Sequence, residues 1–210
     1  MHIGRTLPPA AAPISLQDIL AGLSGLRRGR RELARFECEL KEFFGVDYCF
    51  LVSSGKAALT IILRALKAMY PNRDQVLIPA YTCYSVPSAI VRAGLNVQLC
   101  DMHPETLDFD YAQLDRFLHR AKPQPNKLNK HGQPSTRFLA LIAAHLFGIA
   151  SNIEGLRSLI GDNEPVIVED AAQAMGGKRN NRKLGTLGDV GFFSLGRGKA
   201  ISTVEGGIIL

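Results

Sequence analysis

The chain has 210 residues, a hydrophobic fraction of 46% and a charged fraction of 21%, values typical of a globular protein with a sizeable core and not of a disordered one. No apolar run reaches the roughly 18–20 residues of a membrane span. The four cysteines are widely spaced without a C-x-x-C pair, and three lie in apolar stretches expected to be buried, so we expect reduced thiols and neither a disulfide framework nor a zinc site.

The formal net charge is +6, and much of the excess lies in two basic clusters, at residues 27–35 and 121–137. Neither cluster is accompanied by interleaved aromatic residues or by a known DNA-reading motif. A solvated helix face and a surface loop are therefore the favoured explanation, and nucleic acid is not an expected partner. The basic balance is also compatible with an anionic substrate.

Residues 1–28 are predicted to form an N-terminal arm, extended at first and then helical. The leader to Pro13 is rich in proline and alanine, and Ser15 is a suitable N-cap for a short helix that ends near Leu23. The arm lacks the cationic end and apolar stretch of a secretory signal, so the expected location is cytoplasmic.

From residue 29 onward, segments with helical periodicity alternate with short apolar runs. The predicted helices are 29–44, which Gly45 ends, 55–69, 82–93, 111–120 and 151–160. The predicted strands are 48–52, 75–78, 97–100, 138–144, 165–168, 190–194 and 207–210. This alternation predicts a mainly parallel α/β sheet covered on both faces, with a ligand site beyond the carboxyl ends of the strands.

The chain stops inside an apolar run that follows Gly206 and Gly207. We expect this run to be part of a strand and the parent protein to continue. Residues 29–210 are then one large domain, incomplete at its C-terminal end, and the 210-residue chain alone is expected to be inactive.

Residues 50–60, FLVSSGKAALT, combine an apolar run, a tight turn and a helix-forming run. The first amides of such a helix, together with its dipole, make an anion site. A nucleotide-binding P-loop needs glycine where this chain has Phe50, and serine or threonine where it has Ala57, which disfavours a nucleoside triphosphate. The candidate phosphate-binding groups are Gly55 and the amides of Lys56 and Ala57.

Two later segments bring polar side chains to the ends of predicted strands. Asp170 follows the strand at 165–168, and Gln173 lies about one turn further on. Asp170 could pair with a cationic ring nitrogen or simply cap the next helix. The strand ending at Ser194 leads into a glycine-rich turn that contains Lys199, which could be a solvated loop residue or a Schiff-base lysine.

Together these segments resemble the DegT/DnrJ/StrS family of fold-type-I enzymes that use pyridoxal 5'-phosphate (PLP), most of which are sugar aminotransferases. The similar segments, in order, are FECELKEFFGV, SSGKAALTIIL, VLIPAYTCYSVPSAIVRAGLNVQLCDMHPETLDFD, HLFG, EDAAQA, and KLGTLGDVGFFS followed by Lys199 and EGG. The last is the most specific, because spacing and residue type both agree. The resemblance implies the three-layer α/β/α large domain of an aspartate aminotransferase-like PLP transferase, truncated before the small domain.

The resemblance also implies a role for each matching residue. Lys199 would hold PLP covalently and move a proton during the reaction. Asp170 would keep the pyridine nitrogen protonated, and Gln173 would bond to the phenolic oxygen of the ring. Ser194 and the amides of Lys56 and Ala57 would hold the phosphate.

Four positions depart from the family pattern, one of them being Leu195, since the usual S-F-x-x-x-K becomes SLGRGK. Lys56 stands where the family usually has threonine, and Val204 replaces the glycine before EGG. Cys83 aligns with the aromatic residue that stacks on the ring, and Tyr81 or Tyr84 could take over that contact. These changes indicate a divergent branch.

The implied activity is the transfer of an amino group from an amino acid, with glutamate the expected donor, to a keto group such as one on a nucleotide-linked sugar. A homodimer is expected, and no metal. One alternative is a PLP-dependent sugar dehydratase, which Lys199 disfavours because some relatives in that role carry histidine there. The other is a non-catalytic PLP-binding or regulatory protein.

Overall fold

The computed structural model describes residues 15–25, 29–120, 138–160 and 165–210. The basic segment 121–137 and the first two arginines of the 27–35 cluster lie outside these ranges. The strands of the main sheet are β1 (Phe50–Val52), β2 (Gln75–Pro79), β3 (Asn96–Cys100), β4 (Phe138–Ala144), β5 (Val166–Asp170), β8 (Val190–Ser194) and β9 (Gly207–Ile209). A small hairpin consists of β6 (Lys178–Arg179) and β7 (Arg182–Lys183).

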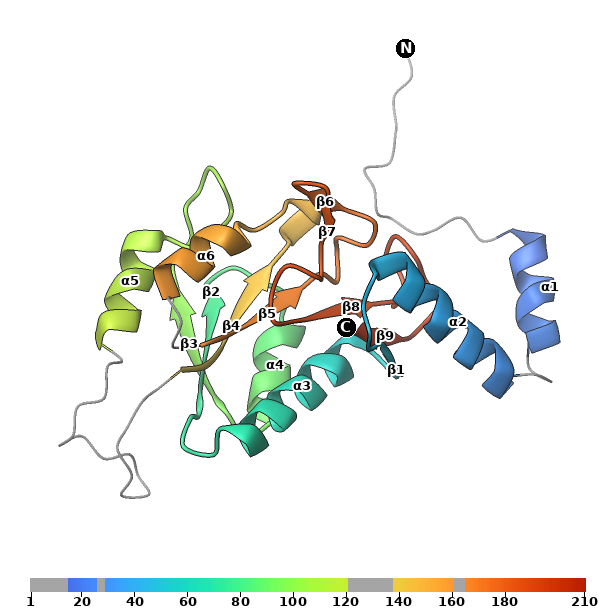
Figure 1. The fold of residues 1–210 in the computed structure, drawn as a ribbon, viewed down its shortest axis with the longest axis horizontal. Coiled ribbons are helices and arrows are strands. Elements are labelled where there is room, and N and C mark those ends of the chain that lie inside the picture. The colour runs from blue at the N-terminus through green and yellow to red at the C-terminus, as the bar shows by residue number, and fades with distance from the viewer. Residues whose placement is uncertain (1–14, 26–28, 121–137, 161–164) are drawn as a thin grey trace, which may run out of the picture.

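The seven strands form one sheet in the order β1-β9-β8-β5-β4-β2-β3 (Figure 1). β8, β5, β4, β2 and β3 run parallel, whereas β9 pairs antiparallel with both β1 and β8. All seven residues of β4 are buried, which explains the continuous apolar run FLALIAA at the centre of the sheet. The predicted α/β fold with a mainly parallel sheet is confirmed.

The helices are α1 (Leu16–Gly25), α2 (Gly29–Phe44), α3 (Gly55–Met69), α4 (Ser85–Arg92), α5 (Tyr111–Arg120) and α6 (Ile153–Ile160), with a short 3-10 turn η1 (Leu146–Gly148). The core has two apolar clusters. Side chains of α2, α5 and α6 belong to one, and side chains of α3 and α4 belong to the other. The helices therefore cover opposite faces of the sheet and complete a three-layer structure (Figure 1).

Two helices begin later than predicted, each for a local reason. α4 starts at Ser85 instead of residue 82, which leaves Pro87 in the first turn, where its missing N–H costs nothing. α6 starts after Asn152. The side-chain oxygen of Asn152 accepts the Gly155 N–H, and the backbone N–H of Asn152 is donated to the Asp108 carboxylate. The hairpin of β6 and β7 was not predicted. Its loop is Asn180-Asn181, both with positive φ, as a two-residue hairpin turn requires.

The strand β5 continues two residues beyond the predicted end at 168. Glu169 and Asp170 remain in the ladder, because they pair in register with Ala143 and Ala144 of β4. Asp170 thus occupies the last position of a central strand instead of a loop, which fixes its backbone.

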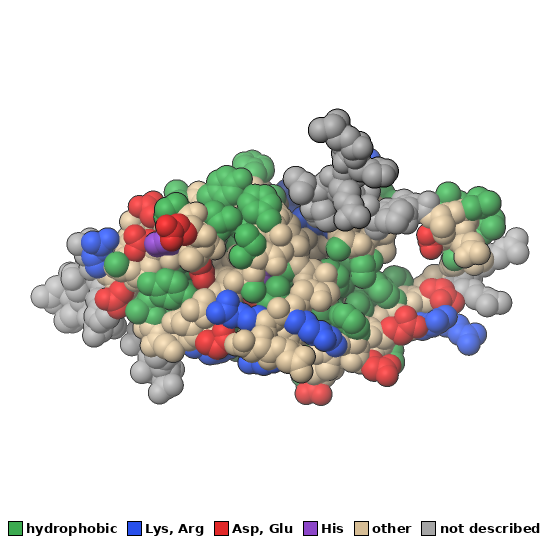
Figure 2. Space-filling model, turned by 90° about the horizontal axis from the view of Figure 1, so that it is seen from above, with side chains coloured by type: hydrophobic (Ala, Val, Ile, Leu, Met, Phe, Trp, Pro, Cys, Tyr) green, Lys and Arg blue, Asp and Glu red, His purple; other side chains and the backbone are tan. Residues whose placement is uncertain are grey.

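Several large apolar side chains lie on the surface. No residue of α1 is buried, and four of its large apolar side chains are exposed: Leu16, Ile19, Leu20 and Leu23. Figure 2 shows apolar side chains gathered in several patches on one face, between charged groups. Among the described helices, none has the length and apolar character needed to cross a bilayer.

Candidate active site

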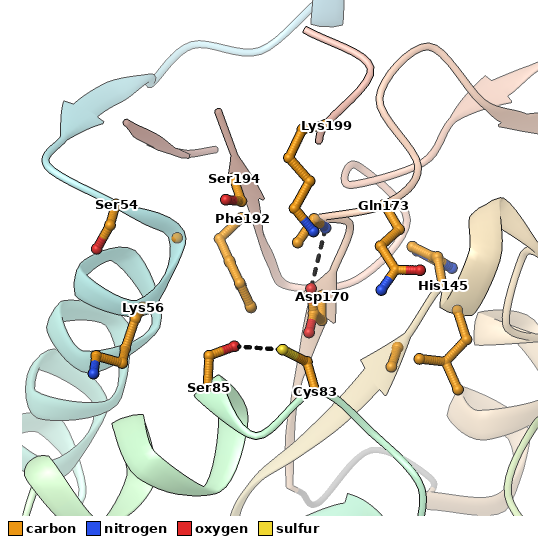
Figure 3. Close-up of a pocket in the computed structure, with 14 residues that line it drawn as sticks. Ser54, Lys56, Cys83, Ser85, His145, Asp170, Gln173, Phe192, Ser194 and Lys199 are labelled. Carbon is orange, nitrogen blue, oxygen red and sulfur yellow. Dashed lines mark hydrogen bonds between the residues drawn. The ribbon is translucent and has the colours of Figure 1, made fainter. Parts of the chain in front are cut away.

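A cavity of about 280 Å³ lies at the carboxyl ends of β4, β5 and β8, beside the N-terminal turns of α3 and α4 (Figure 3). The sequence-predicted residues that line it are Gly55, Lys56, Cys83, Asp170, Gln173, Ser194 and Lys199. Ala57 is not part of the wall. The segments that carry these residues are far apart in the sequence, and the parallel sheet brings them to one edge.

One end of the cavity is formed where α3 begins against the end of β8. Ser54 caps α3, with its Oγ accepting the Ala57 N–H at 3.1 Å. Ala57 therefore donates to the cap instead of to a ligand. The preceding amides, Gly55 and Lys56, have no acceptor within the described ranges and are available to an anion. The Lys56 side chain points away from Lys199 and Asp170 (Figure 3).

Glycine at position 55 is required by the close approach of these two elements. A Cβ there would lie 2.9 Å from the Cβ of Ser194, closer than two carbon atoms pack. The absence of a side chain lets the Ser194 hydroxyl stand beside the first turn of α3. Its Oγ accepts the Gly196 N–H at 3.3 Å and keeps its own proton free for an anion.

Asp170 lies at the end of β5, in the cavity wall, and is 8% exposed. Its Oδ1 accepts the Ala172 N–H at 3.1 Å, while Oδ2 has no donor in the part of the chain that the structure describes. Burial raises the pKa of Asp170, and the Ala172 N–H together with the positive charge of Lys199 only partly offsets this effect. A buried carboxylate with a free oxygen is suited to a cationic hydrogen-bond donor.

The side-chain amide of Gln173 has a defined orientation. Its Oε1 accepts the backbone N–H of Phe147 at 2.8 Å. The NH₂ group therefore faces the cavity as a donor (Figure 3).

Lys199 reaches the cavity from the loop that joins β8 to β9, and its side chain extends toward Asp170 (Figure 3). The base of this loop is closed by backbone hydrogen bonds from Leu195 to Gly206 and from Thr203 to Leu195. Val204, in the same loop, has a φ of 72°, a left-handed conformation that is unusual for a β-branched residue.

Cys83, which stands at the position expected for the ring-stacking aromatic residue, lines the cavity. Its Sγ accepts a 3.1 Å hydrogen bond from the Ser85 hydroxyl. Neither Tyr81 nor Tyr84 lines the cavity, and both are exposed. All four cysteines are free thiols. Cys49 and Cys100 are buried as expected, but the third expected burial fails because Cys83 opens onto the cavity.

Two residues were not predicted from the sequence as part of the site: His145, which is in the cavity wall, and Glu169, which lies behind it. His145 follows β4 directly, lines the cavity, and its Nε2 lies 2.7 Å from Glu169 Oε2. Both side chains are fully buried. The available signal was a histidine after one buried strand and a glutamate within the next, but the pattern alone does not show that the two side chains meet.

Comparison with known proteins decides the family. The model of the DegT/DnrJ/EryC1/StrS aminotransferase family matches residues 16–210. The chain belongs to this family. The GDP-perosamine synthase of Vibrio cholerae is 31% identical over 176 residues, which cover 84% of this chain and 43% of that protein.

Two further relatives show the range of this family. The L-glutamine:2-deoxy-scyllo-inosose aminotransferase of Micromonospora echinospora is 27% identical over 96% of this chain and 46% of its own length. The E. coli GDP-4-keto-6-deoxy-D-mannose-3-dehydratase, solved with bound hydrated PLP, superposes with a TM-score of 0.79 at 25% identity, over 98% of this chain and 51% of that one. The chain thus spans about half the length of the relatives it matches. The fold is that of one half of a fold-type-I PLP aminotransferase.

Proposed function

We propose that the full-length protein is a PLP-dependent aminotransferase that moves an amino group from an amino acid to a keto group. Glutamate is the donor we favour, and a keto group on a nucleotide-linked sugar is the acceptor class. The amino-transferring relatives support the reaction type, and the basic balance of the chain supports an anionic acceptor.

The observation that carries the proposal is the convergence of Lys199, Asp170 and Gln173 on one cavity that ends at the first amides of α3. These groups come from one strand end, two loops and a helix start. Each could be a cap or a surface residue when taken alone. Their meeting in a single cavity favours the functional interpretation.

The donors and acceptors of the cavity fit PLP. The free Gly55 and Lys56 amides and the Ser194 hydroxyl suit a phosphate. The free Oδ2 of Asp170 suits a protonated ring nitrogen, and the NH₂ of Gln173 suits the phenolic oxygen. When bound, PLP supplies an electron sink for the substrate carbon.

The residues of the chain then divide the remaining work. Asp170 holds a proton on the ring nitrogen, because its buried carboxylate gains a partner only when that nitrogen is charged. Gln173 orients the ring by a single hydrogen bond. Lys199, on a long flexible side chain, is the group we assign to covalent attachment and to moving a proton at the substrate carbon.

The dehydratase activity is a second candidate, because the E. coli dehydratase shares the fold over almost the whole chain. Lys199 favours amino transfer over dehydration. The two reactions differ in product, since a dehydratase releases water with no net transfer of nitrogen. We further propose that a second subunit and the part of the enzyme beyond this domain complete the site.

The test is a mass-shift assay of the full-length enzyme with PLP, glutamate and a panel of keto-sugar nucleotides. Amino transfer replaces the keto oxygen of one acceptor with an amino group and produces 2-oxoglutarate. Loss of water without gain of nitrogen would establish the dehydratase instead. If the protein binds no PLP, both candidates fail.

A further inference from the structure

We propose that Glu169 is a positioning residue that acts through His145 and the turn Leu146–Gly148 to hold the Gln173 amide in its cavity-facing orientation. The proposal rests on the proposed function, because the proposed role of Gln173 is to bind PLP. The contacts that carry the proposal are nevertheless present without a bound cofactor. Glu169 does not line the cavity.

Glu169 is a buried anion surrounded by donors. Its Oε2 accepts from His145 Nε2 and from the Gly185 N–H, and its Oε1 accepts from the Leu187 and Gly188 amides. Burial alone would raise the pKa of Glu169, but the hydrogen bonds from His145, Gly188 and Gly185 lower it overall. The side chain is therefore held as a carboxylate with four donors.

These contacts select one tautomer of His145. The Nδ1 atom accepts the Ser151 N–H at 3.0 Å, so it carries no proton. The proton of the neutral ring must then be on Nε2, where it is donated to Glu169. The ring is fixed from both sides, by a donor at Nδ1 and an acceptor at Nε2.

His145 begins the turn that reaches Gln173. Its backbone N–H is donated to the Asp170 carbonyl, and its carbonyl accepts the Gly148 N–H. Between them Phe147 has a φ of 56°, a strained conformation for a residue other than glycine. With this turn in place, the Phe147 N–H points at Gln173 Oε1.

A glutamine at position 169 cannot replace the glutamate. All four neighbours of the Glu169 carboxylate donate hydrogen bonds, so the NH₂ group of glutamine would face donors in either orientation. It would lose either the His145 and Gly185 contacts or the Leu187 and Gly188 contacts. His145 cannot compensate by moving its proton to Nδ1, because the Ser151 N–H lies there.

The first test is amide hydrogen exchange of the full-length, PLP-free protein, read by NMR. The Phe147 side chain is exposed, and its amide is protected through Gln173 Oε1. Gln173→Ala should lower its protection at least tenfold, and Glu169→Gln should do the same. Glu154→Gln, which alters a surface glutamate paired with Arg179, is the control and should leave it unchanged.

Unchanged protection of Phe147 in folded Glu169→Gln would overturn the proposal. If that variant does not fold, His145→Asn breaks the same chain at the next step, because the shorter side chain can still accept from Ser151 but does not reach Glu169. The same tenfold criterion applies to it. Since no cofactor is needed, the result is independent of whether the proposed function is correct.

A second test uses the visible absorbance of the PLP-bound protein as a function of pH. A hydrogen-bond donor to the phenolic oxygen stabilises the ionised form of that oxygen. Losing the Gln173 donor should therefore raise the midpoint pH of the absorbance change by about one unit. Glu169→Gln should also raise this midpoint pH, and the double variant Glu169→Gln/Gln173→Ala should have the same midpoint pH as Gln173→Ala alone. Fully additive shifts would show that Glu169 acts by another route and would overturn the proposal.

Discussion

Gln173 Oε1 accepts a 2.8 Å hydrogen bond from the Phe147 N–H, and this contact decides which end of the Gln173 amide faces the cavity. A free glutamine could present either its oxygen or its nitrogen to a ligand. Here the oxygen is engaged, and the nitrogen is left to donate. The hydrogen-bonding character of this part of the site is thus set by a backbone group of a neighbouring turn.

Replacing Gln173 with glutamate should reverse that character. One carboxylate oxygen can still accept from Phe147, but the other would meet the phenolic oxygen of PLP as a second acceptor. A hydrogen bond to a charged group contributes about 1.5–3 kcal/mol, so the dissociation constant of PLP should rise at least tenfold, as measured by titration of the visible absorbance. Gln173→Ala is the control and should lose less affinity. Equal affinities for wild type and Gln173→Glu would contradict the assignment.

Asp170→Asn should make the PLP-free protein more stable while abolishing its function. The raised pKa of Asp170 means that the folded state disfavours the carboxylate. The free-energy cost of ionising Asp170 in the folded protein is absent below pH 3.8, the ordinary pKa of an aspartate. It grows as the pH rises from there toward the raised pKa of the folded state. We expect a gain of about 1–3 kcal/mol in urea unfolding at neutral pH, disappearing near pH 3. A gain that does not depend on pH, or a loss of stability, would contradict this account.

The layout of the fold could be predicted from the sequence, as could many of the residues that the structure brings together at the cavity. Period-2 and period-3.6 patterns are local, so α2, α3, β4 and β8 were predicted with the bounds that the structure has. The extension of β5 through Asp170 was not predicted. Glu169 and Asp170 have low strand propensities, but pairing with β4 keeps both of them in the strand.

Contacts between distant segments account for the remaining misses. The pairing of His145 with Glu169 joins two strands, and the engagement of the Ala57 amide by Ser54 depends on the geometry of the cap. The sequence could not decide between Tyr81, Cys83 and Tyr84 as neighbours of the ring either. That choice depends on the direction in which the loop before α4 leaves the sheet.

Gly55→Ala should damage the phosphate end of the cavity. The added methyl would lie 2.9 Å from Ser194 Cβ, so α3 must shift away from β8, at a cost of about 1–3 kcal/mol. We expect a lower thermal midpoint and weaker PLP binding. Gly22→Ala is the matched control, because nothing lies within 4 Å of its added methyl. Comparable behaviour of the two variants in calorimetry would exclude the tight contact.

Val204→Gly should stabilise the loop that carries Lys199. Valine at a φ of 72° is strained, whereas glycine adopts this conformation freely. We expect a gain of about 1 kcal/mol in chemical denaturation after the greater entropy of unfolded glycine is included. Val91→Gly, at an exposed site inside α4, should instead destabilise. Destabilisation by Val204→Gly of the same size as by Val91→Gly would contradict the strained conformation.

The central claim is that Lys199 is the lysine that holds the cofactor. The direct measurement is reduction of the PLP-loaded full-length protein with borohydride, followed by proteolysis and peptide mass spectrometry. The account predicts a pyridoxyl-phosphate adduct on the peptide that contains Lys199, and its loss in Lys199→Ala. An adduct on Lys56, or an unchanged yield of adduct in Lys199→Ala, would contradict it.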